Sequence, residues 1–445
     1  MRSGDAIRCA SGKPQPAIVA CTNIVNDKHE SDEARAIALR NRAYQFQQAG
    51  DPDHAIADYT AALDRPEPSA TLAKIRLNRG ALYIQKGEEP AALEDLGKAL
   101  ALDPKLKSAY VTRASILAKR GDDPEALDDL NHAVLLDPND AAAYIARGSL
   151  YSHRGDQSQA IADFSRAIAI DPNNAIAWRD RGFAHRESGE NSAAEADAAE
   201  AIRLNPDLAS AHFDLGLSLA APGRTAQAAL EFDKAIALNP LDPHAFKARG
   251  DLNLAQGDAD RAIADFTSAI ALDAKLVSAY VNRGTAYMNK SEWDLAITDF
   301  STAIGLEPRL YAPYVNRGQA FGAKHERERA IADFAQAIRI KPNAPWPYVQ
   351  RAYFRQLAGD NQGAIEDYSR AIELDPKNSE ALRGRGYVRL TRHEADGAIA
   401  DLTAAIALNP KDTLAYRFRS AAYAERKDTQ KASLDDATAL KLAHP

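Results

Sequence analysis

The residue types that most often do chemistry are present in this chain of 445 residues, but their spacing forms no catalytic motif. The ten histidines are dispersed, and none belongs to a His-Glu-x-x-His zinc motif. The densest charged string, His325 to Arg329, alternates Glu and Arg and is typical of a solvated loop. Neither a glycine-rich phosphate loop nor a Gly-x-Ser-x-Gly nucleophile elbow occurs. The sequence therefore predicts a protein that is not an enzyme, with no cofactor and no metal site.

Composition limits the kinds of partner. The chain has 55 basic and 62 acidic residues, a net charge of −7, so the basic surface of a nucleic-acid binder is not expected. No run of about 18 apolar residues is present, which argues against insertion into a membrane. Residues 1–8 lack the apolar core of a secretory signal. Two cysteines are too few for a zinc framework or a disulfide-dense scaffold.

A period of 34 residues organises the chain. It is marked by prolines that follow similar residues, with one double step across Ala274: Pro104, Pro138, Pro172, Pro206, Pro240, Pro308, Pro342, Pro376 and Pro410. Within a unit the eighth residue is always small, and the twentieth and twenty-seventh are always Ala. We predict twelve tandem units over residues 36–445, starting near 36, 73, 107, 141, 175, 209, 243, 277, 311, 345, 379 and 413.

Each unit has the pattern of two amphipathic helices. The small eighth and twentieth residues allow the helices to approach closely. Gly, the usual fifteenth residue, favours a helix C-terminus, and the proline at the thirty-second ends the second helix. Strand patterns of period two are absent. An all-α fold is expected.

These spacings resemble the tetratricopeptide repeat (TPR) family. The segments 279–287 (AYVNRGTAY) and 296–308 (AITDFSTAIGLEP) are similar to the NRG/DF variety found in bacterial TPR proteins. The resemblance implies a right-handed superhelical solenoid, with residues 1–35 as a truncated N-terminal capping hairpin and linker. It also implies a non-enzymatic scaffold whose concave groove, lined by the first helix of each unit, binds a peptide segment of a partner protein.

The groove positions vary from unit to unit, and three groups of them are candidate peptide-binding residues. The first is a set of asparagines able to donate to and accept from peptide amides: Asn41, Asn78, Asn282 and Asn316. The second lies in the middle of the chain: Arg179, Phe183, Arg186 and Phe213. The third lies near the C-terminus: Trp346, Gln350, Tyr353, Arg383, Tyr387 and Arg417.

Arg and aromatic residues dominate interface hot spots, so we expect a peptide of acidic character at the third group. The alternative is that these long side chains only cover exposed surface. A carboxylate clamp for an acidic chaperone tail is not expected, because Asp251 follows Lys247 where the clamp needs Asn.

A recurring pair of charges is interpreted as structural. The seventh residue is Arg and the twenty-third is Asp in eleven units, and the exceptions, Leu215 and Glu231, share one unit. We expect bidentate Arg–Asp pairs, within a unit or between neighbours. The eleventh residue, often aromatic, is Asn253, Arg355 or Arg389 in three units, where looser packing is expected.

Cys9 and Cys21 align with the twelfth and twenty-fourth residues of a unit, which the resemblance places across a helical hairpin. A disulfide is therefore expected. It would require an oxidising compartment, so the protein is predicted to be periplasmic or exported, although this chain shows no signal peptide. Two buried thiols in the cytoplasm are the alternative.

A structural role is the competing function: self-association, or spacing of larger complexes. Asp436 replaces the large twenty-fourth residue of the last unit, beside Asp435. A stack that continued head to tail would keep an apolar end, so a closed, monomeric array is favoured.

Overall fold

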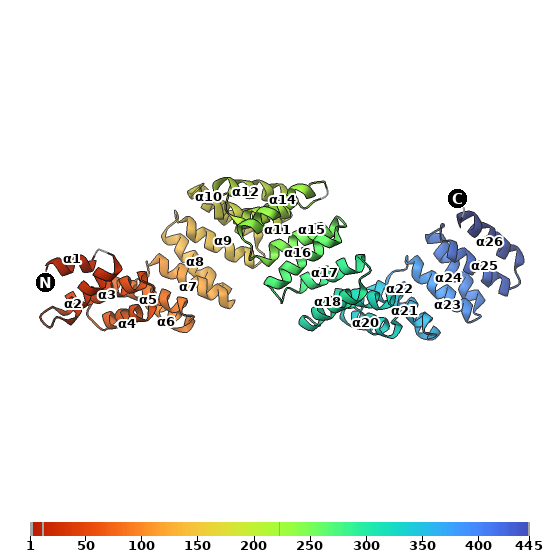
Figure 1. Ribbon diagram of the computed structural model, residues 1–445, viewed down its shortest axis with the longest axis horizontal. Coiled ribbons are helices and arrows are strands. Elements are labelled where there is room, and N and C mark those ends of the chain that lie inside the picture. Colours follow the sequence, from red (N-terminus) through yellow and green to blue (C-terminus); the bar gives the residue numbers. More distant parts are fainter. Residues whose placement is uncertain (1–2, 11–12, 222, 444–445) are drawn as a thin grey trace. The chain divides into compact units, whose positions relative to one another are not determined.

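The computed structural model describes residues 3–10, 13–221 and 223–443. Every regular element in these ranges is an α-helix, so the prediction of an all-α fold is confirmed (Figure 1). The 26 helices form a repeat solenoid and fall into two compact units, Met1–Ala221 and Pro222–Pro445.

In the first unit each helix packs against the next. Its helices are α1 (Ser3–Ala10), α2 (Pro14–Asn26), α3 (Asp32–Gln48), α4 (Pro52–Leu63), α5 (Ser69–Gln85), α6 (Glu89–Leu102), α7 (Lys107–Arg120), α8 (Asp123–Leu136), α9 (Ala141–His153), α10 (Gln157–Ile170), α11 (Ala175–Glu187), α12 (Asn191–Leu204) and α13 (Ala209–Leu219).

The second unit is built in the same way. Its helices are α14 (Thr225–Leu238), α15 (Pro243–Ala255), α16 (Ala259–Leu272), α17 (Val277–Asn289), α18 (Trp293–Leu306), α19 (Tyr311–Ala323), α20 (Arg327–Ile340), α21 (Pro345–Leu357), α22 (Asn361–Leu374), α23 (Ser379–Thr391), α24 (Ala395–Leu408), α25 (Thr413–Glu425) and α26 (Thr429–Ala443).

The turn after each first helix needs a left-handed residue. Gly121, for example, follows α7 with φ of 80°. Only glycine adopts this conformation without steric cost. Four turns use another residue and still have φ of 60° to 63°: Ser291, His325, His393 and Lys427. The backbone of the repeat is thus kept where the preferred residue is missing.

The core is made by the small and large residues of the period. The Ala at the twentieth and twenty-seventh places are buried throughout. Between them lie large side chains with almost no exposure, such as Phe164, Phe266 and Phe300. The ring of Phe300 lies directly against Gly284, where a side chain would leave no room for it. Small residues therefore set how closely paired helices approach.

Each Arg–Asp pair lies within one repeat of the 34-residue period. Arg283 donates from Nε and Nη2 to both oxygens of Asp299, each at 2.8 Å, and this raises the pKa of Arg283. Its Nη1 donates to Thr267 Oγ1 of the preceding second helix at 3.0 Å. The other ten pairs are Arg42–Asp58, Arg79–Asp95, Arg113–Asp129, Arg147–Asp163, Arg181–Asp197, Arg249–Asp265, Arg317–Asp333, Arg351–Asp367, Arg385–Asp401 and Arg419–Asp435.

Asn253, Arg355 and Arg389, at the eleventh place of their units, are hydrogen bonded, and looser packing beside them stays a prediction. Each donates to the carboxylate that already receives the arginine of its unit. The contacts are Asn253 Nδ2 to Asp265 (2.9 Å), Arg355 Nη1 to Asp367 (2.9 Å) and Arg389 Nη1 to Asp401 (2.8 Å). A further donor replaces the aromatic ring at these places.

Candidate functional site

The first helices of successive repeats contact one another within each of the two compact units and so form a continuous surface. In the first unit α5 contacts α7, α7 contacts α9, α9 contacts α11, and α11 contacts α13. In the second unit α21 contacts α23, and α23 contacts α25. The second and third predicted groups lie on these two surfaces.

On α21, α23 and α25 three members of the C-terminal group remain available to a ligand. Tyr353 is 47% exposed and packs edge-on against Phe354. The Tyr387 ring lies 4.5 Å from that of Phe418, which joins α23 to α25. Arg417 is exposed and has no ion-pair partner among the described residues. This surface offers aromatic rings and, next to Phe418 in the chain, one cation without an ion-pair partner among the described residues.

Two of the other three members, Arg383 and Trp346, are engaged within the protein. Arg383 Nη1 lies 2.9 Å from Asp412 Oδ2, and the Asp412 side chain is 5% exposed. Trp346 packs edge-on against Phe334, and Gln350 is half-buried. Arg383 already compensates a buried carboxylate, and the expectation that it also supplies charge to a ligand stays a prediction.

The middle group lies in the first unit, where its charges are paired locally. Arg179 lies 2.8 Å from Asp180, and Arg186 lies over the ring of Phe183. Phe213 is half-buried on α13. Beside Phe213, burial raises the pKa of Asp214 to about 6, despite the opposing charges of the two arginines. This group carries little free charge toward a ligand.

Sequence reasoning missed a hollow between α7 and α9. It has a volume of about 430 Å³ and is lined mainly by apolar or small side chains such as Val111, Ala146 and Leu150. Lys119 and His153 also line it and make no ion pair within the described residues. A second hollow of about 500 Å³ is lined by His153 as well and extends to Arg179. Small residues at these groove positions were the available signal.

The asparagine group does not form a free ladder. Asn282 Nδ2 donates to Asp251 Oδ1 at 2.6 Å, and Asn78 Nδ2 lies 3.4 Å from the Tyr59 hydroxyl. Asn41 Nδ2 lies 3.9 Å from Cys9 Sγ. Only Asn316, which is half-buried, makes no side-chain hydrogen bond to the described residues. Three members thus have contacts within the protein, and their binding of peptide amides stays a prediction.

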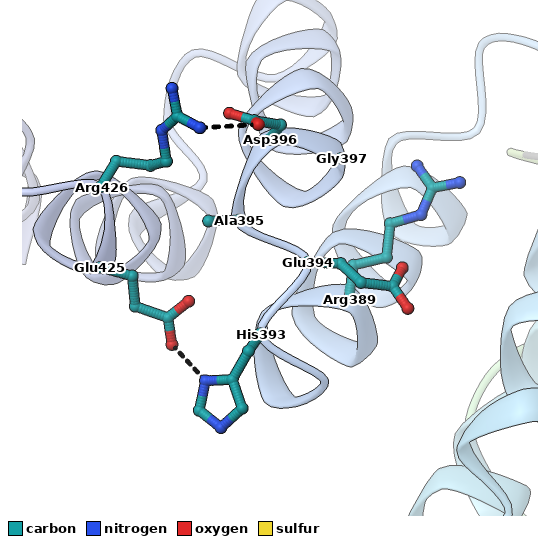
Figure 2. Close-up of a pocket in the computed structure, with 8 residues that line it drawn as sticks. All are labelled: Arg389, His393, Glu394, Ala395, Asp396, Gly397, Glu425 and Arg426. Carbon is teal, nitrogen blue, oxygen red and sulfur yellow. Dashed lines mark hydrogen bonds and ion pairs between the residues drawn. The ribbon is translucent and has the colours of Figure 1, made fainter.

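A charged pocket of about 720 Å³ lies where the turn before α24 approaches the end of α25 (Figure 2). His393 Nδ1 lies 3.0 Å from Glu425, and Arg426 lies 2.8 Å from Asp396. Glu394 in the same pocket lies 2.9 Å from Arg392. Because its charges are mutually paired, this pocket ties two neighbouring repeats together rather than offering a free ligand site.

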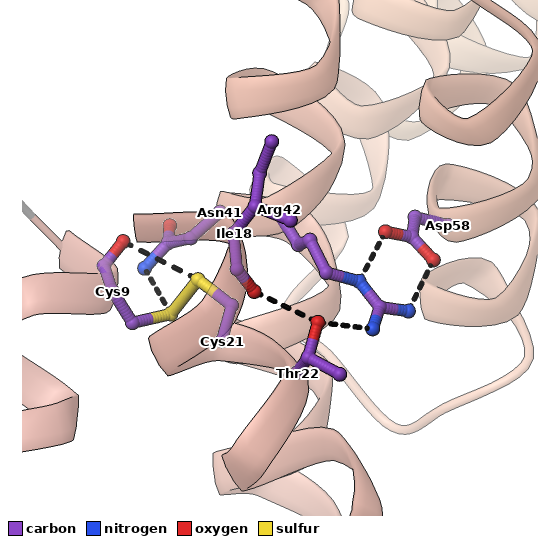
Figure 3. The surroundings of a disulfide bond; sticks show 7 residues. All are labelled: Cys9, Ile18, Cys21, Thr22, Asn41, Arg42 and Asp58. Atoms are coloured by element: carbon purple, nitrogen blue, oxygen red, sulfur yellow. Dashed lines mark hydrogen bonds and ion pairs between the residues drawn. A yellow bond between two sulfur atoms is a disulfide. The ribbon is translucent and has the colours of Figure 1, made fainter. Parts of the chain in front are cut away.

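At the N-terminus a disulfide joins Cys9 of α1 to Cys21 of α2, with Cα atoms 4.8 Å apart (Figure 3). Both cysteines are buried. The next residue, Thr22, accepts a hydrogen bond from Arg42 Nη1 at 3.0 Å. Thr22 thus accepts a hydrogen bond from Arg42 just as Thr267 accepts one from Arg283. Helix α2 therefore packs against α3 as the second helix of a preceding repeat would.

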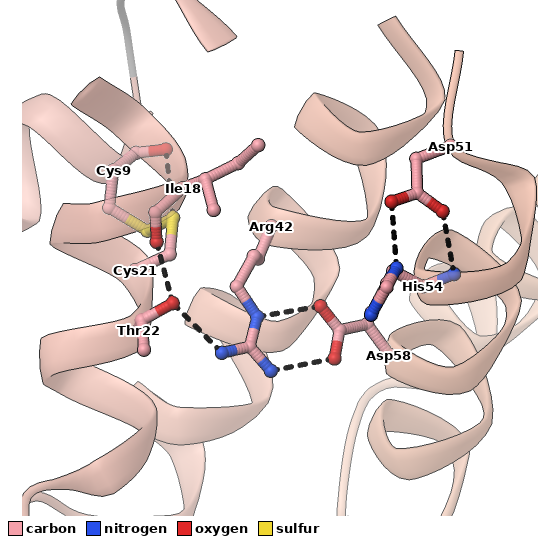
Figure 4. A network of polar contacts seen from close by, with 8 residues as sticks. All are labelled: Cys9, Ile18, Cys21, Thr22, Arg42, Asp51, His54 and Asp58. Atoms are coloured by element: carbon pink, nitrogen blue, oxygen red, sulfur yellow. Dashed lines mark hydrogen bonds and ion pairs between the residues drawn. A yellow bond between two sulfur atoms is a disulfide. The ribbon is translucent and has the colours of Figure 1, made fainter. Parts of the chain in front are cut away.

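The same contacts extend from the disulfide into the first complete helix pair (Figure 4). Arg42 also binds both oxygens of Asp58 at 2.7 Å. Asp51, the N-cap of α4, accepts from the backbone of His54 at 3.2 Å and lies 2.7 Å from its Nδ1. The hairpin is therefore coupled to α3 and α4 by charge-assisted hydrogen bonds.

No group of three or more His, Cys, Asp or Glu side chains among the described residues is arranged to hold a metal ion. None of the described helices is both long and apolar enough to cross a membrane.

Stacked helix pairs with a continuous first-helix surface define the class of helical repeat proteins. Tetratricopeptide repeat models match residues 40–107, 114–177, 179–243, 221–277 and 311–344, and a TPR repeat model matches residues 357–391. The chain belongs to the tetratricopeptide repeat family, whose members mediate protein–protein interactions. No enzyme family is among the matches.

Solved structures resemble the chain at low sequence identity. YrrB, described as a TPR protein with an unusual peptide-binding site, is 22% identical with a TM-score of 0.38, over 41% of this chain and 95% of its own. Yeast Tom70 is 19% identical with a TM-score of 0.38, over 93% and 100%. A tetratricopeptide repeat protein from Parabacteroides merdae is 20% identical with a TM-score of 0.47, over 56% and 99%. No curated protein sequence matches the chain.

Proposed function

We propose that this protein is a non-enzymatic scaffold of the bacterial NRG/DF variety that binds a peptide of acidic character on the surface of α21, α23 and α25. The observation that carries the proposal is the exposed Arg417, which has no ion-pair partner among the described residues and on α25 directly precedes Phe418 of the Tyr387–Phe418 ring pair. Arg and Tyr are enriched among residues that dominate binding energy. A carboxylate of the peptide would pair with Arg417, and its apolar atoms would cover the rings.

The proposal is tested by selecting random peptides displayed on phage against the intact chain. Arg417→Ala is expected to weaken a selected peptide by about 10-fold or more, as for an interface hot spot. The affinity should also fall as salt rises, because exposed charges are screened over about 10 Å at 0.1 M.

The matched control is Arg261→Ala, since this arginine of α16 is 79% exposed and lies outside the proposed surface. The control variant should bind as the intact chain does. Selected peptides that bind equally well to Arg417→Ala and Tyr387→Ala would reject the site.

We also propose that the protein acts in an oxidising compartment, as a periplasmic or exported protein. The buried Cys9–Cys21 disulfide supports this, because such bonds persist outside the reducing cytoplasm. Thiol counting on protein isolated from its source without reductant tests it. Two free thiols would favour the cytoplasmic alternative.

Self-association is the second candidate function, and one observation favours it. On α26, Leu434 is 68% exposed and Leu440 is 58% exposed, so this helix is less polar than Asp436 suggested. Sedimentation over a range of concentrations separates the two functions. A mass that rises with concentration in the intact chain, but not in Leu434→Ser/Leu440→Ser, would favour self-association over the monomer.

A further inference from the structure

The hydroxyl of one largely buried tyrosine lies beneath the proposed peptide surface. Tyr368 of α22 is 3% exposed, and its side chain belongs to the core between α21 and α23. Its hydroxyl makes no hydrogen bond to the described residues and is not fully enclosed by them, so water or a ligand can reach it. A hydroxyl that lacks a partner within the protein is satisfied by water or by a ligand.

Gly384 is the reason the hydroxyl has room. A Cβ on this residue of α23 would lie 2.7 Å from the Tyr368 oxygen and would collide with the ring. Gly384 stands between Arg383 and Arg385, and the ionisable groups that act on the phenol are Glu380, Arg383, Tyr353 and Asp367. Glu380, Arg383 and Tyr353 occupy groove positions of α21 and α23. The hydroxyl therefore reaches the floor of the peptide surface at a notch without a side chain.

The chain contains its own comparison. Tyr59 holds the same place in an earlier unit, and there the residue equivalent to Gly384 is Asn78. Asn78 Nδ2 lies 3.4 Å from the Tyr59 hydroxyl, which also lies 3.5 Å from Gln47 Oε1. The tyrosine hydroxyl therefore has partners within the protein at Tyr59 and has none among the described residues at Tyr368.

The local charge favours a neutral acceptor. Arg383 is already paired with Asp412, and Glu380 is exposed nearby, so a second carboxylate at the notch would be repelled. Burial raises the pKa of Tyr368, which keeps the phenol protonated and able to donate. A missing side chain also lets a peptide backbone approach closely.

We propose that the Tyr368 hydroxyl, at the Gly384 notch, donates a hydrogen bond to a main-chain carbonyl of the bound peptide. This inference rests on the proposed peptide site and adds a neutral, backbone-reading contact to it. Arg417 would recognise peptide charge, whereas Tyr368 would fix the register of an extended backbone.

A first experiment needs no ligand. Tyr368→Phe removes a hydroxyl that bonds to no other described residue, so the thermal midpoint of the intact chain should stay the same or rise. Tyr59→Phe is the matched control, since it removes a bonded hydroxyl and should lower the midpoint. A lower midpoint for Tyr368→Phe, equal to that of Tyr59→Phe, would show that the hydroxyl is satisfied within the fold and would overturn the inference.

The second experiment uses a phage-selected peptide whose binding depends on Arg417. Each amide of the peptide is replaced in turn by an ester, which weakens the carbonyl as an acceptor. One ester should weaken binding to the intact chain by about 3- to 10-fold and have no effect on binding to Tyr368→Phe. The loss in Tyr368→Phe should not vary with salt, unlike that in Arg417→Ala.

The outcomes separate the two proposals. If esters and Tyr368→Phe act independently, or if the loss maps to an acidic side chain of the peptide, the Tyr368 contact is rejected while the peptide site stands. If no selected peptide depends on Arg417 or Tyr387, the site itself is rejected and the Tyr368 contact with it.

Discussion

Replacing the glycine at the eighth place of a unit should have opposite effects in two repeats. Gly80 and Gly284 hold this place on α5 and α17. A Cβ on Gly80 would lie 3.4 Å from Leu96 Cγ, an ordinary van der Waals contact. A Cβ on Gly284 would lie 2.7 Å from Phe300 Cε1 and 3.0 Å from two further ring carbons. The size of the facing residue therefore decides whether replacing the glycine stabilises or destabilises the protein.

The magnitudes follow from two opposing terms. Ala is favoured over Gly in a helix interior by about 0.8–1 kcal/mol, so Gly80→Ala should stabilise the protein by about 0.5–1 kcal/mol. Gly284→Ala has the same gain, but overpacking a filled core typically costs about 1–3 kcal/mol. The net result should be a loss of about 1 kcal/mol at Gly284.

Urea unfolding followed by circular dichroism gives the overall change, and amide hydrogen exchange in α5–α6 and α17–α18 gives the local one. Local exchange is needed because repeat arrays open in parts rather than as one cooperative body. Gly284→Ala/Phe300→Leu restores the smaller facing residue and should recover part of the loss through a favourable coupling. Changes of the same sign at Gly80 and Gly284 would refute the packing argument.

Three other changes test the charges and the disulfide. Because burial raises the pKa of Asp214 to about 6, the folded chain binds this proton more tightly and loses stability as pH rises from about 4 to about 6. Asp214→Asn should therefore raise the thermal midpoint at pH 7 and leave it nearly unchanged at pH 4. Asp401→Ala strands two arginines and should destabilise by about 3 kcal/mol or more, a larger urea-unfolding loss than Asp299→Ala, which strands one. Reducing Cys9–Cys21 should weaken the N-terminal hairpin by about 3 kcal/mol, seen as faster amide exchange in α1 and α2 with unchanged exchange in α25.

The helical architecture could be predicted because it depends on residues that recur. Ala262 and Ala269 are fully buried, and their equivalents in other units share that environment. A position under the same packing constraint in every unit shows its constraint in the sequence. Even the turns at His325 and His393 keep the left-handed backbone, so losing the favoured glycine does not hide the repeat.

The contacts of the candidate surface were harder to predict because each of its polar residues pairs with one particular neighbour. Arg383 was expected to face a ligand, but it forms an ion pair with Asp412, the N-cap of α25. Asp412 lies 29 residues later in the chain. Asn282 was expected to grip a peptide, but Asp251 of the preceding first helix accepts its amide. Such pairs occur once each, so the periodicity of the sequence holds no signal for them.

Departures from the repeat pattern do indicate a contact when two of them occur in the same unit. Arg355 and Arg389, the two arginines at the eleventh place, are in units whose nineteenth residue is glycine, Gly363 and Gly397. Arg355 Nη1 donates to the Gly363 carbonyl at 3.2 Å, and a Cβ on Gly397 would lie 3.1 Å from Arg389 Cδ. A small residue there gives the long arginine its path to the buried carboxylate. The same reasoning connects Gly384 to Tyr368: in both cases a missing side chain on one helix is explained by a polar group reaching toward it from another.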